Sequence, residues 1–324
     1  MAARSNSSIP VRRESLNPMI RRVAFTLITG LLAIANIASA AENPAAPPAV
    51  TARSWAIADA DSGKLLWSHL PDEPRKAAST TKMMAAYVVL ELARDAAILD
   101  EQIEASALAA STPGSVAGLR QGERIGVRDG LYALMLPSGN DMGNAFAEHF
   151  NSRFEAPGDE TPENAKTEAN ATRVNFIAEM NRTARRLGMN DTHYRSPYGD
   201  GGTPEDRTTT ARDLVTLAVA ARRHPLFREV VATTDKAIRV HLPDGSLRRL
   251  AWANTNRLLE IDGYDGIKTG STKLAENCLV ASGTQGGRRF IVVTLGSSSD
   301  QSRFTDSKDL FRWASRQVIP EPSR

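Results

Sequence analysis

The hydrophobic pattern predicts β-strands near both ends of the chain. Two apolar runs, 55–57 and 65–67, flank Asp-Ala-Asp-Ser-Gly at 59–63, and this turn-forming stretch predicts a β-hairpin. The same reasoning predicts two more hairpins, one from 238–242 that turns at 243–245 and one from 278–282 that returns through 285–287 into 290–295.

The middle of the chain has the spacing of helices. Residues 82–92 are almost wholly apolar after Lys82, which is typical of a helix buried on all sides. Thr208 or Thr209 is expected to cap a later helix that begins at 210. Since strands gather at the ends and helices in the middle, the sequence predicts an α/β sandwich with a mainly helical second lobe inserted in it. The other predicted helices span 127–136, 141–150, 174–187, 210–222 and 304–316.

Residues 1–40 have the pattern of a signal peptide. Two arginines precede a mostly apolar run at 23–38, and Ala38-Ser39-Ala40 supplies the small residues that a signal peptidase reads. The run is shorter than the roughly 20 residues needed to cross a bilayer. We therefore expect cleavage after Ala40, export to the periplasm or cell-wall space, and no stable membrane anchor afterwards. An uncleaved anchor is the alternative, and Met19 is a second candidate start.

The composition of the rest of the chain predicts a linker, a globular domain and a short tail. Three prolines among alanines at 41–52 predict a linker, and a two-lobed globular domain is expected at 53–318, followed by a tail at 319–324. The polar, acidic stretch 152–172 is expected to be a surface loop, and the sequence assigns it no function.

Composition excludes several classes of protein. With 41% hydrophobic and 24% charged residues among 324, the chain is globular. The first 40 residues hold five arginines and one glutamate, so the net charge of +3 leaves −1 for the remainder, and overall charge indicates no nucleic-acid partner. The single cysteine excludes an internal disulfide, and the five histidines lack paired ligand spacing. No metal or cofactor is expected, and nothing in the sequence sets an oligomeric state.

Candidate chemistry begins at Ser79-Thr80-Thr81-Lys82. Three residues apart on a helix, Ser79 and Lys82 can touch. Serine needs a base to become a nucleophile, and lysine can serve if burial and a second cation remove its proton. The alternative is a helix cap followed by a surface lysine. However, a lysine directly before the apolar residues of a buried helix requires a partner or a cleft.

Two other short motifs supply the rest of a possible site. Ser138-Gly139-Asn140 lies in a break between helices, where a loop can project a hydroxyl and an amide; an N-cap role is the alternative. In Lys268-Thr269-Gly270, Lys268 would be the second cation and Thr269 a hydroxyl for a substrate carboxylate. Gly270, with no side chain, would let a ligand lie against a strand.

The three motifs in this order resemble those of serine β-lactamases and penicillin-binding proteins. More closely, the chain resembles the low-molecular-mass D-alanyl-D-alanine carboxypeptidases, from about Ser54 to Trp313. This resemblance implies a β-lactamase/transpeptidase-like fold, in which helices flank an antiparallel sheet and a mainly helical lobe carries the Ser-x-Asn loop. The matching segments are 76–84, 138–141, 180–181 with 186–189, 209–213 and 265–270.

The resemblance also implies catalytic roles. Ser79 would attack the carbonyl between the two terminal D-alanines of a peptidoglycan stem peptide, and Lys82 would accept its proton. Ser138 would relay a proton to the leaving D-alanine, and Asn140 would hold the substrate backbone. β-Lactam antibiotics, which mimic the dipeptide, would acylate Ser79.

Binding roles follow from the same resemblance. Lys268 would add positive potential, and Thr269 and Arg303 would lie near the terminal carboxylate, although Arg303 could equally be a surface ion-pair partner. The backbone N–H groups of Ser79 and Ser271 would form the oxyanion hole. Several relatives have histidine at the position of Ser271, which leaves fine specificity open.

Four functions remain in competition. The favoured one is the carboxypeptidase, and an endopeptidase that cuts D-alanyl–diaminopimelate cross-links shares its chemistry. A β-lactamase would need a carboxylate to activate the deacylating water, and no convincing Glu-x-x-Leu-Asn motif lies outside the acidic stretch. A non-catalytic cell-wall binding module is the fourth, but such modules usually lose the nucleophile or its base.

Overall fold

The computed structural model describes residues 46–95, 97–157, 171–199 and 208–317. The predicted signal peptide, the start of the linker, most of the acidic stretch and the predicted tail lie outside the described residues. From Pro47 onward the chain forms one compact unit, and the description below concerns that unit alone.

A five-stranded antiparallel sheet joins the two ends of this unit. Its strand order is β2-β1-β9-β8-β7, so the β1–β2 hairpin pairs with β9, the last strand that the structure describes, and β7 lies at an edge. The predictions of hairpins at 55–67 and 278–295 are confirmed. The strands are β1 (Ser54–Asp59), β2 (Leu65–His69), β7 (Tyr264–Thr272), β8 (Glu276–Gln285) and β9 (Arg288–Ser297).

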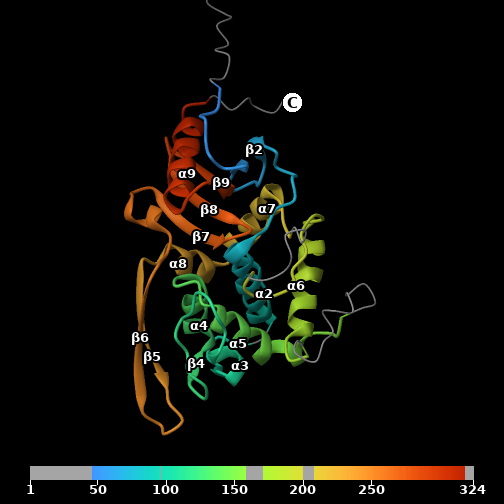
Figure 1. The fold of residues 1–324 in the computed structure, drawn as a ribbon, viewed down its shortest axis with the longest axis vertical. Helices are drawn as coiled ribbons and strands as arrows, with labels where there is room; N and C mark the ends of the chain where they lie inside the picture. The colour runs from blue at the N-terminus through green and yellow to red at the C-terminus, as the bar shows by residue number, and fades with distance from the viewer. Residues whose placement is uncertain (1–45, 96, 158–170, 200–207, 318–324) are drawn as a thin grey trace, which may run out of the picture. The chain divides into compact units, whose positions relative to one another are not determined.

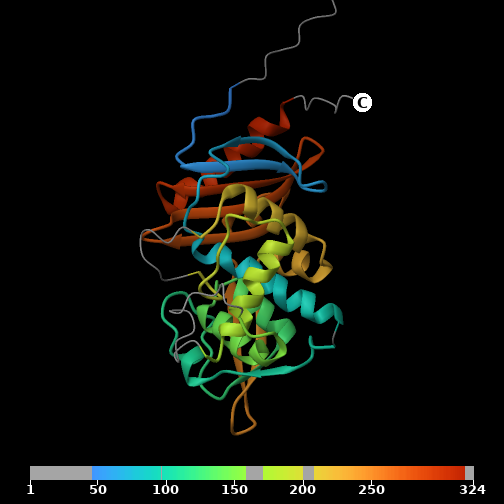
Figure 2. The ribbon, with the colours of Figure 1, turned by 90° about the vertical axis from the view of Figure 1, so that its right-hand side faces the viewer.

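Both faces of this sheet are covered, which explains the unbroken apolar run in β9. Phe290 and Val292 pack with α9 (Asp300–Ser315) in one core, whereas Ile291 and Val293 pass to the main core on the opposite face. Successive side chains of a strand point to opposite faces, so only an all-apolar strand can serve two cores. Helices α7 (Ala211–Arg222) and α8 (Pro225–Ala232) lie on the face opposite α9 (Figure 2).

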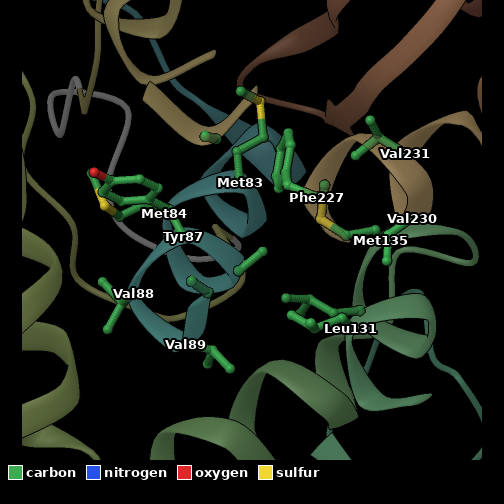
Figure 3. Close-up of a cluster of buried hydrophobic side chains, with 14 of the residues drawn as sticks. Met83, Met84, Tyr87, Val88, Val89, Leu131, Met135, Phe227, Val230 and Val231 are labelled. Atoms are coloured by element: carbon green, nitrogen blue, oxygen red, sulfur yellow. The ribbon is translucent and has the colours of Figure 1, made fainter. Parts of the chain in front are cut away.

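Helix α2 (Lys82–Asp95) occupies the centre of the main core, as its apolar sequence predicted. Figure 3 shows Met83, Met84 and Val89 leaving the helix in different directions, with Leu131 and Phe227 among their neighbours. Fully burying such a side chain contributes about 1.5–3 kcal/mol. The first turn of α2, which carries Lys82, is therefore anchored by the core beneath it.

Helices α4, α5 and α6 pack around α2, and their predicted positions are confirmed to within one residue. Helices α3 and α8 were not predicted, and α9 begins four residues before the predicted start at 304. The cap prediction for α7 is wrong: Thr210, rather than Thr208 or Thr209, accepts the backbone N–H of Asp213. Thr209 instead pairs with Arg75 through backbone hydrogen bonds. The helices are α3 (Ala107–Ala110), α4 (Val127–Met135), α5 (Asn140–Phe150) and α6 (Val174–Arg186).

A second sheet, which the sequence only partly predicted, lies in this helical lobe. Its order is β3-β4-β5-β6, and its predicted hairpin β5–β6 runs along the helices in Figure 1. Strands β3 and β4 have three residues each, too few for alternation to be recognised. No helix in the described ranges is long and apolar enough to span a membrane. The strands are β3 (Gln102–Glu104), β4 (Arg124–Gly126), β5 (Asp235–His241) and β6 (Leu247–Ala253).

Candidate active site

Ser79 and Lys82 meet at the start of α2. The short helix η1 (Ala78–Thr81) runs directly into α2, and Lys82 Nζ lies 2.9 Å from Ser79 Oγ. Lys82 is fully buried and Ser79 is 8% exposed. The alternative of a helix cap with a surface lysine is therefore wrong. A hydroxyl and an amine at hydrogen-bond distance form the nucleophile–base pair that serine chemistry requires.

Two further oxygens surround the Lys82 amine. Its Nζ lies 2.7 Å from Asn140 Oδ1 and 3.1 Å from the backbone oxygen of Tyr198. The Asn140 amide in turn donates to the carbonyl of Pro113 at 2.8 Å, which fixes the orientation of its oxygen toward Lys82. Tyr198 was not predicted, because a backbone carbonyl can come from any residue type.

Gly199 explains how the Tyr198 carbonyl reaches the site. Its φ is +92°, and a Cβ there would lie 1.8 Å from the carbonyl oxygen of Ala78. Only glycine fits both the left-handed conformation and this close approach. The loop that carries Tyr198 thus lies directly against the turn that carries the nucleophile.

Ser138 is buried next to Asn140 in a strained conformation. Its φ is +65°, in the left-handed region that costs a non-glycine residue about 1–2 kcal/mol. Its Oγ has no hydrogen-bond partner in the part of the chain that the structure describes. Helix α5 has Gly139 as its N-cap, without a side-chain cap, so the N-cap alternative is wrong for both Ser138 and Asn140. An unpaired buried hydroxyl costs about 1–3 kcal/mol, and it is available to a ligand.

Asp141 holds the loop opposite Ser138. Its carboxylate accepts the backbone N–H groups of residues 117, 118 and 119 at 2.8, 2.8 and 3.1 Å. The same loop is tied to Asn140 N through the carbonyl of Ser115 at 2.7 Å. The role of Asp141 was not predicted, because its partners lie more than 20 residues away in the sequence and no short motif indicates such a contact.

Strand β7 forms the opposite side of the site. Gly270 lies against the nucleophile turn, since a Cβ there would be 3.1 Å from the backbone nitrogens of both Ser79 and Thr80. Thr269 Oγ1 is 2.7 Å from Thr255 Oγ1, and the exposed Ser271 donates to Asn277 Oδ1 at 3.0 Å. The absence of a side chain at position 270 is what lets the strand approach so closely.

Arg303 is a buried part of the same side, not a surface residue. Its Nη1 donates to Ser271 Oγ at 2.7 Å and to the Gly270 carbonyl at 3.2 Å, and it also pairs with Asp300. Helix α9 therefore supports β7 at the two residues that follow Thr269.

Lys268 is buried in β7, and its amine donates to the carbonyl of Thr269 at 3.1 Å. Burial lowers the pKa of Lys268 well below 10.5, and the positive charges of Lys82 and Arg303 lower it further. Two ammonium groups that repel each other in a buried site cannot easily hold both protons. The lysine pair therefore readily releases a proton.

Replacing Lys268 with methionine is expected to raise the free energy of unfolding by about 1–3 kcal/mol at pH 6 while activity falls. Because the folded-state pKa is the lower one, the unfolded chain binds more protons between the two pKa values, and wild-type stability rises with pH there. The gain from the substitution should therefore shrink toward zero near pH 10.5.

Urea denaturation at pH 6 and pH 9 measures this difference. Lys64→Met, at an exposed turn lysine between β1 and β2, is the matched control and should show no such gain. A Lys268→Met protein that is less stable than the wild type at pH 6 would contradict the prediction.

The described residues thus bring several hydroxyls, two amines, an amide and a guanidinium to one site. They contain no group of three His, Cys, Asp or Glu side chains that could hold a metal ion. This arrangement can carry out acyl transfer through a serine ester.

Comparison with known proteins identifies similar chains. A D-alanyl-D-alanine carboxypeptidase of Streptomyces sp. (strain K15) is 33% identical over 302 residues, which cover 91% of this chain and 98% of that one. The carboxypeptidase DacC of Escherichia coli (strain K12) is 32% identical over 88% of this chain, but the match spans only 66% of DacC. A D-alanyl-D-alanine endopeptidase of the same E. coli strain is 28% identical, over 88% of this chain and 84% of that one.

The fold agrees with these relatives. The crystal structure of the Streptomyces K15 DD-transpeptidase superposes with a TM-score of 0.73 at 33% identity, covering 83% of this chain and 98% of that one. The family model for D-alanyl-D-alanine carboxypeptidase, Peptidase S11, matches residues 40–155 and 167–299. The predicted penicillin-binding fold is confirmed, and the chain belongs to the Peptidase S11 family of D-alanyl-D-alanine carboxypeptidases.

Proposed function

We propose that this chain is a serine carboxypeptidase that removes the terminal D-alanine from peptidoglycan stem peptides. The observation that carries the proposal is the 2.9 Å approach of Lys82 Nζ to Ser79 Oγ in a buried site. Membership of a family of D-alanyl-D-alanine carboxypeptidases supplies the substrate class.

Acylation begins when Ser79 Oγ attacks the carbonyl carbon between the two terminal D-alanines. The hydroxyl proton passes to Lys82, which accepts it as a neutral amine. Repulsion with the nearby Lys268 disfavours the state in which both lysines are protonated. The backbone N–H groups of Ser79 and Ser271 stabilise the developing oxyanion. The position of Gly270 beside Ser79 N supports this placement, because it brings the two N–H groups to the same side.

The leaving group then departs as a neutral amine. The C–N bond breaks while the proton on Lys82 passes through the Ser138 hydroxyl to the nitrogen of D-alanine. The unpaired, buried Oγ of Ser138 is suited to this relay because no protein group competes for it in the described structure. Water next attacks the acyl carbon and gives a proton to Lys82. The bond to Ser79 Oγ breaks, and that proton restores the hydroxyl.

The substrate carboxylate is held on the β7 side. Thr269 offers a hydroxyl, and Arg303 behind Ser271 offers positive potential. Asn140 contacts the Lys82 amine and also binds the substrate backbone. Since a β-lactam presents the same carbonyl and carboxylate, it acylates Ser79 and blocks the enzyme.

The endopeptidase reading uses the same residues, and no feature of the described site favours it over the carboxypeptidase. A product assay separates them: release of free D-alanine identifies the first, and separated muropeptide dimers the second. We propose that the enzyme acts in the periplasm or cell-wall space, following export and cleavage of a signal peptide after Ala40. The predicted signal peptide lies outside the described residues.

Labelled penicillin tests the proposal directly. The purified protein is expected to form a stable adduct, and mass spectrometry of its peptides should place the label on Ser79. Incubation with a D-alanyl-D-alanine peptide should release D-alanine. Attachment at another residue, rapid turnover of the penicillin, or absence of both reactions would overturn the assignment.

A further inference from the structure

A basic pocket lies at one end of the five-stranded sheet, beyond the catalytic residues. Its volume is about 280 Å³, and it is bordered by the segment before η1, the start of β1 and the turn between β7 and β8. Its charged lining consists of Arg53, Arg75, Lys76, Lys273 and Glu276.

The pocket has an excess of positive charge. Arg53 binds Glu276 through two hydrogen bonds of 2.7 Å, and Arg75 binds Glu73 at 2.7 Å. Of the charged residues that line the pocket, four are cationic and one, Glu276, is a carboxylate. Lys273 is exposed and makes no ion pair or side-chain hydrogen bond with any residue that the structure describes. A pocket with this balance favours an anion.

Its position relative to the nucleophile is set by short lengths of chain. Lys76 precedes Ser79 by three residues, and Lys273 follows Ser271 by two. At roughly 3.3–3.6 Å per residue, the Lys273 backbone lies within about 7 Å of the Ser271 backbone. An extended substrate can therefore reach the pocket with the residue that precedes the acyl D-alanine.

The proposed function gives the direction of the substrate along β7. With the terminal carboxylate at Thr269 and the scissile carbonyl at the Ser271 N–H, the acyl part of the peptide continues toward Thr272 and Lys273. The residue that precedes the acyl D-alanine therefore arrives at the pocket.

We propose that this pocket binds a carboxylate carried by the residue immediately before the two D-alanines, such as the side-chain carboxylate of a diaminopimelate. The inference rests on the proposed function and extends it to specificity. The Lys273 ammonium binds this substrate carboxylate, because Arg53 and Arg75 each already have a carboxylate partner. An uncharged residue at that substrate position gains nothing from the pocket.

Two soluble peptides test this inference: N-acetyl-L-glutamyl-D-alanyl-D-alanine and its glutaminyl counterpart, which differ only in the side-chain charge. Wild-type kcat/KM for D-alanine release is expected to be about 10-fold higher for the glutamyl peptide at low salt, and the ratio should fall as salt rises. In Lys273→Glu the ratio should drop to about 1 or below. Lys64→Glu, which makes the same charge change at the far end of β1, should keep the wild-type ratio.

A binding measurement separates this inference from the proposed function. Calorimetric titration of Ser79→Ala with both peptides needs no turnover and should give the same preference in Kd. Equal Kd values, or a preference that survives Lys273→Glu, would overturn the pocket assignment. A preference in Kd without release of D-alanine by the wild type would support the pocket and refute the carboxypeptidase.

Discussion

Replacing Ser79 with alanine is expected to abolish the penicillin adduct and to lower kcat/KM for D-alanine release by at least about 10³-fold. The substitution removes the only atom that forms the covalent ester, and loss of a serine nucleophile typically has an effect of this size or larger. Both the rate of labelling by penicillin and the release of D-alanine measure it.

The same variant should fold normally. Only one oxygen is lost, and the partner left behind, Lys82, keeps the Asn140 and Tyr198 oxygens. Ser111→Ala, at an exposed serine outside the site, is the matched control and should retain wild-type labelling. A Ser79→Ala protein that still forms a covalent adduct would refute the assigned nucleophile.

Replacing Lys82 with arginine is expected to slow acylation by about 10³-fold or more. A guanidinium keeps the positive charge but does not lose its proton in a protein, so it cannot act as the base. General bases contribute about 10²–10⁴-fold, and a nucleophile without its base often retains little activity. The second-order rate constant for penicillin labelling measures the effect.

Lys82→Met provides a second variant, because the larger guanidinium could disturb the buried site. It removes the charge as well as the base, and thermal unfolding shows whether each protein is folded. Comparable losses in two folded variants would assign the effect to proton transfer. Acylation by folded Lys82→Arg at the wild-type rate would show that Lys82 is not the base.

Local patterns predicted much of the fold. The turn sequence between β1 and β2 and the apolar run of α2 each depend on neighbouring residues, so their structure can be read from a short window. Strands β3 and β4 were missed because each pairs over only three residues. The pairing of β1 with β9 joins residues far apart in the sequence, and no single window contains it.

In the candidate site, too, local contacts could be predicted from the sequence and long-range contacts could not. The spacing of Ser79 and Lys82 was sufficient to predict their contact, because a helical turn fixes the distance. The Tyr198 carbonyl and the Asp141 carboxylate act through backbone groups of distant loops. Such contacts depend on how the loops fold, and the residue type alone does not indicate them. Arg303 could have been either a residue near the substrate carboxylate or a surface ion-pair partner. Its burial, which excludes the surface role, likewise follows from the tertiary structure.

The edge position of β7 restricts what the enzyme can cleave. In the described part of the chain, no strand of its sheet covers the side that runs past the nucleophile, so a substrate can join there only as an added, fully extended segment. Folded polypeptides rarely present such a segment, because their main chain is already paired internally. Short, unstructured stems meet this requirement without any unfolding, and the enzyme is therefore selective by conformation before any chemical group is recognised.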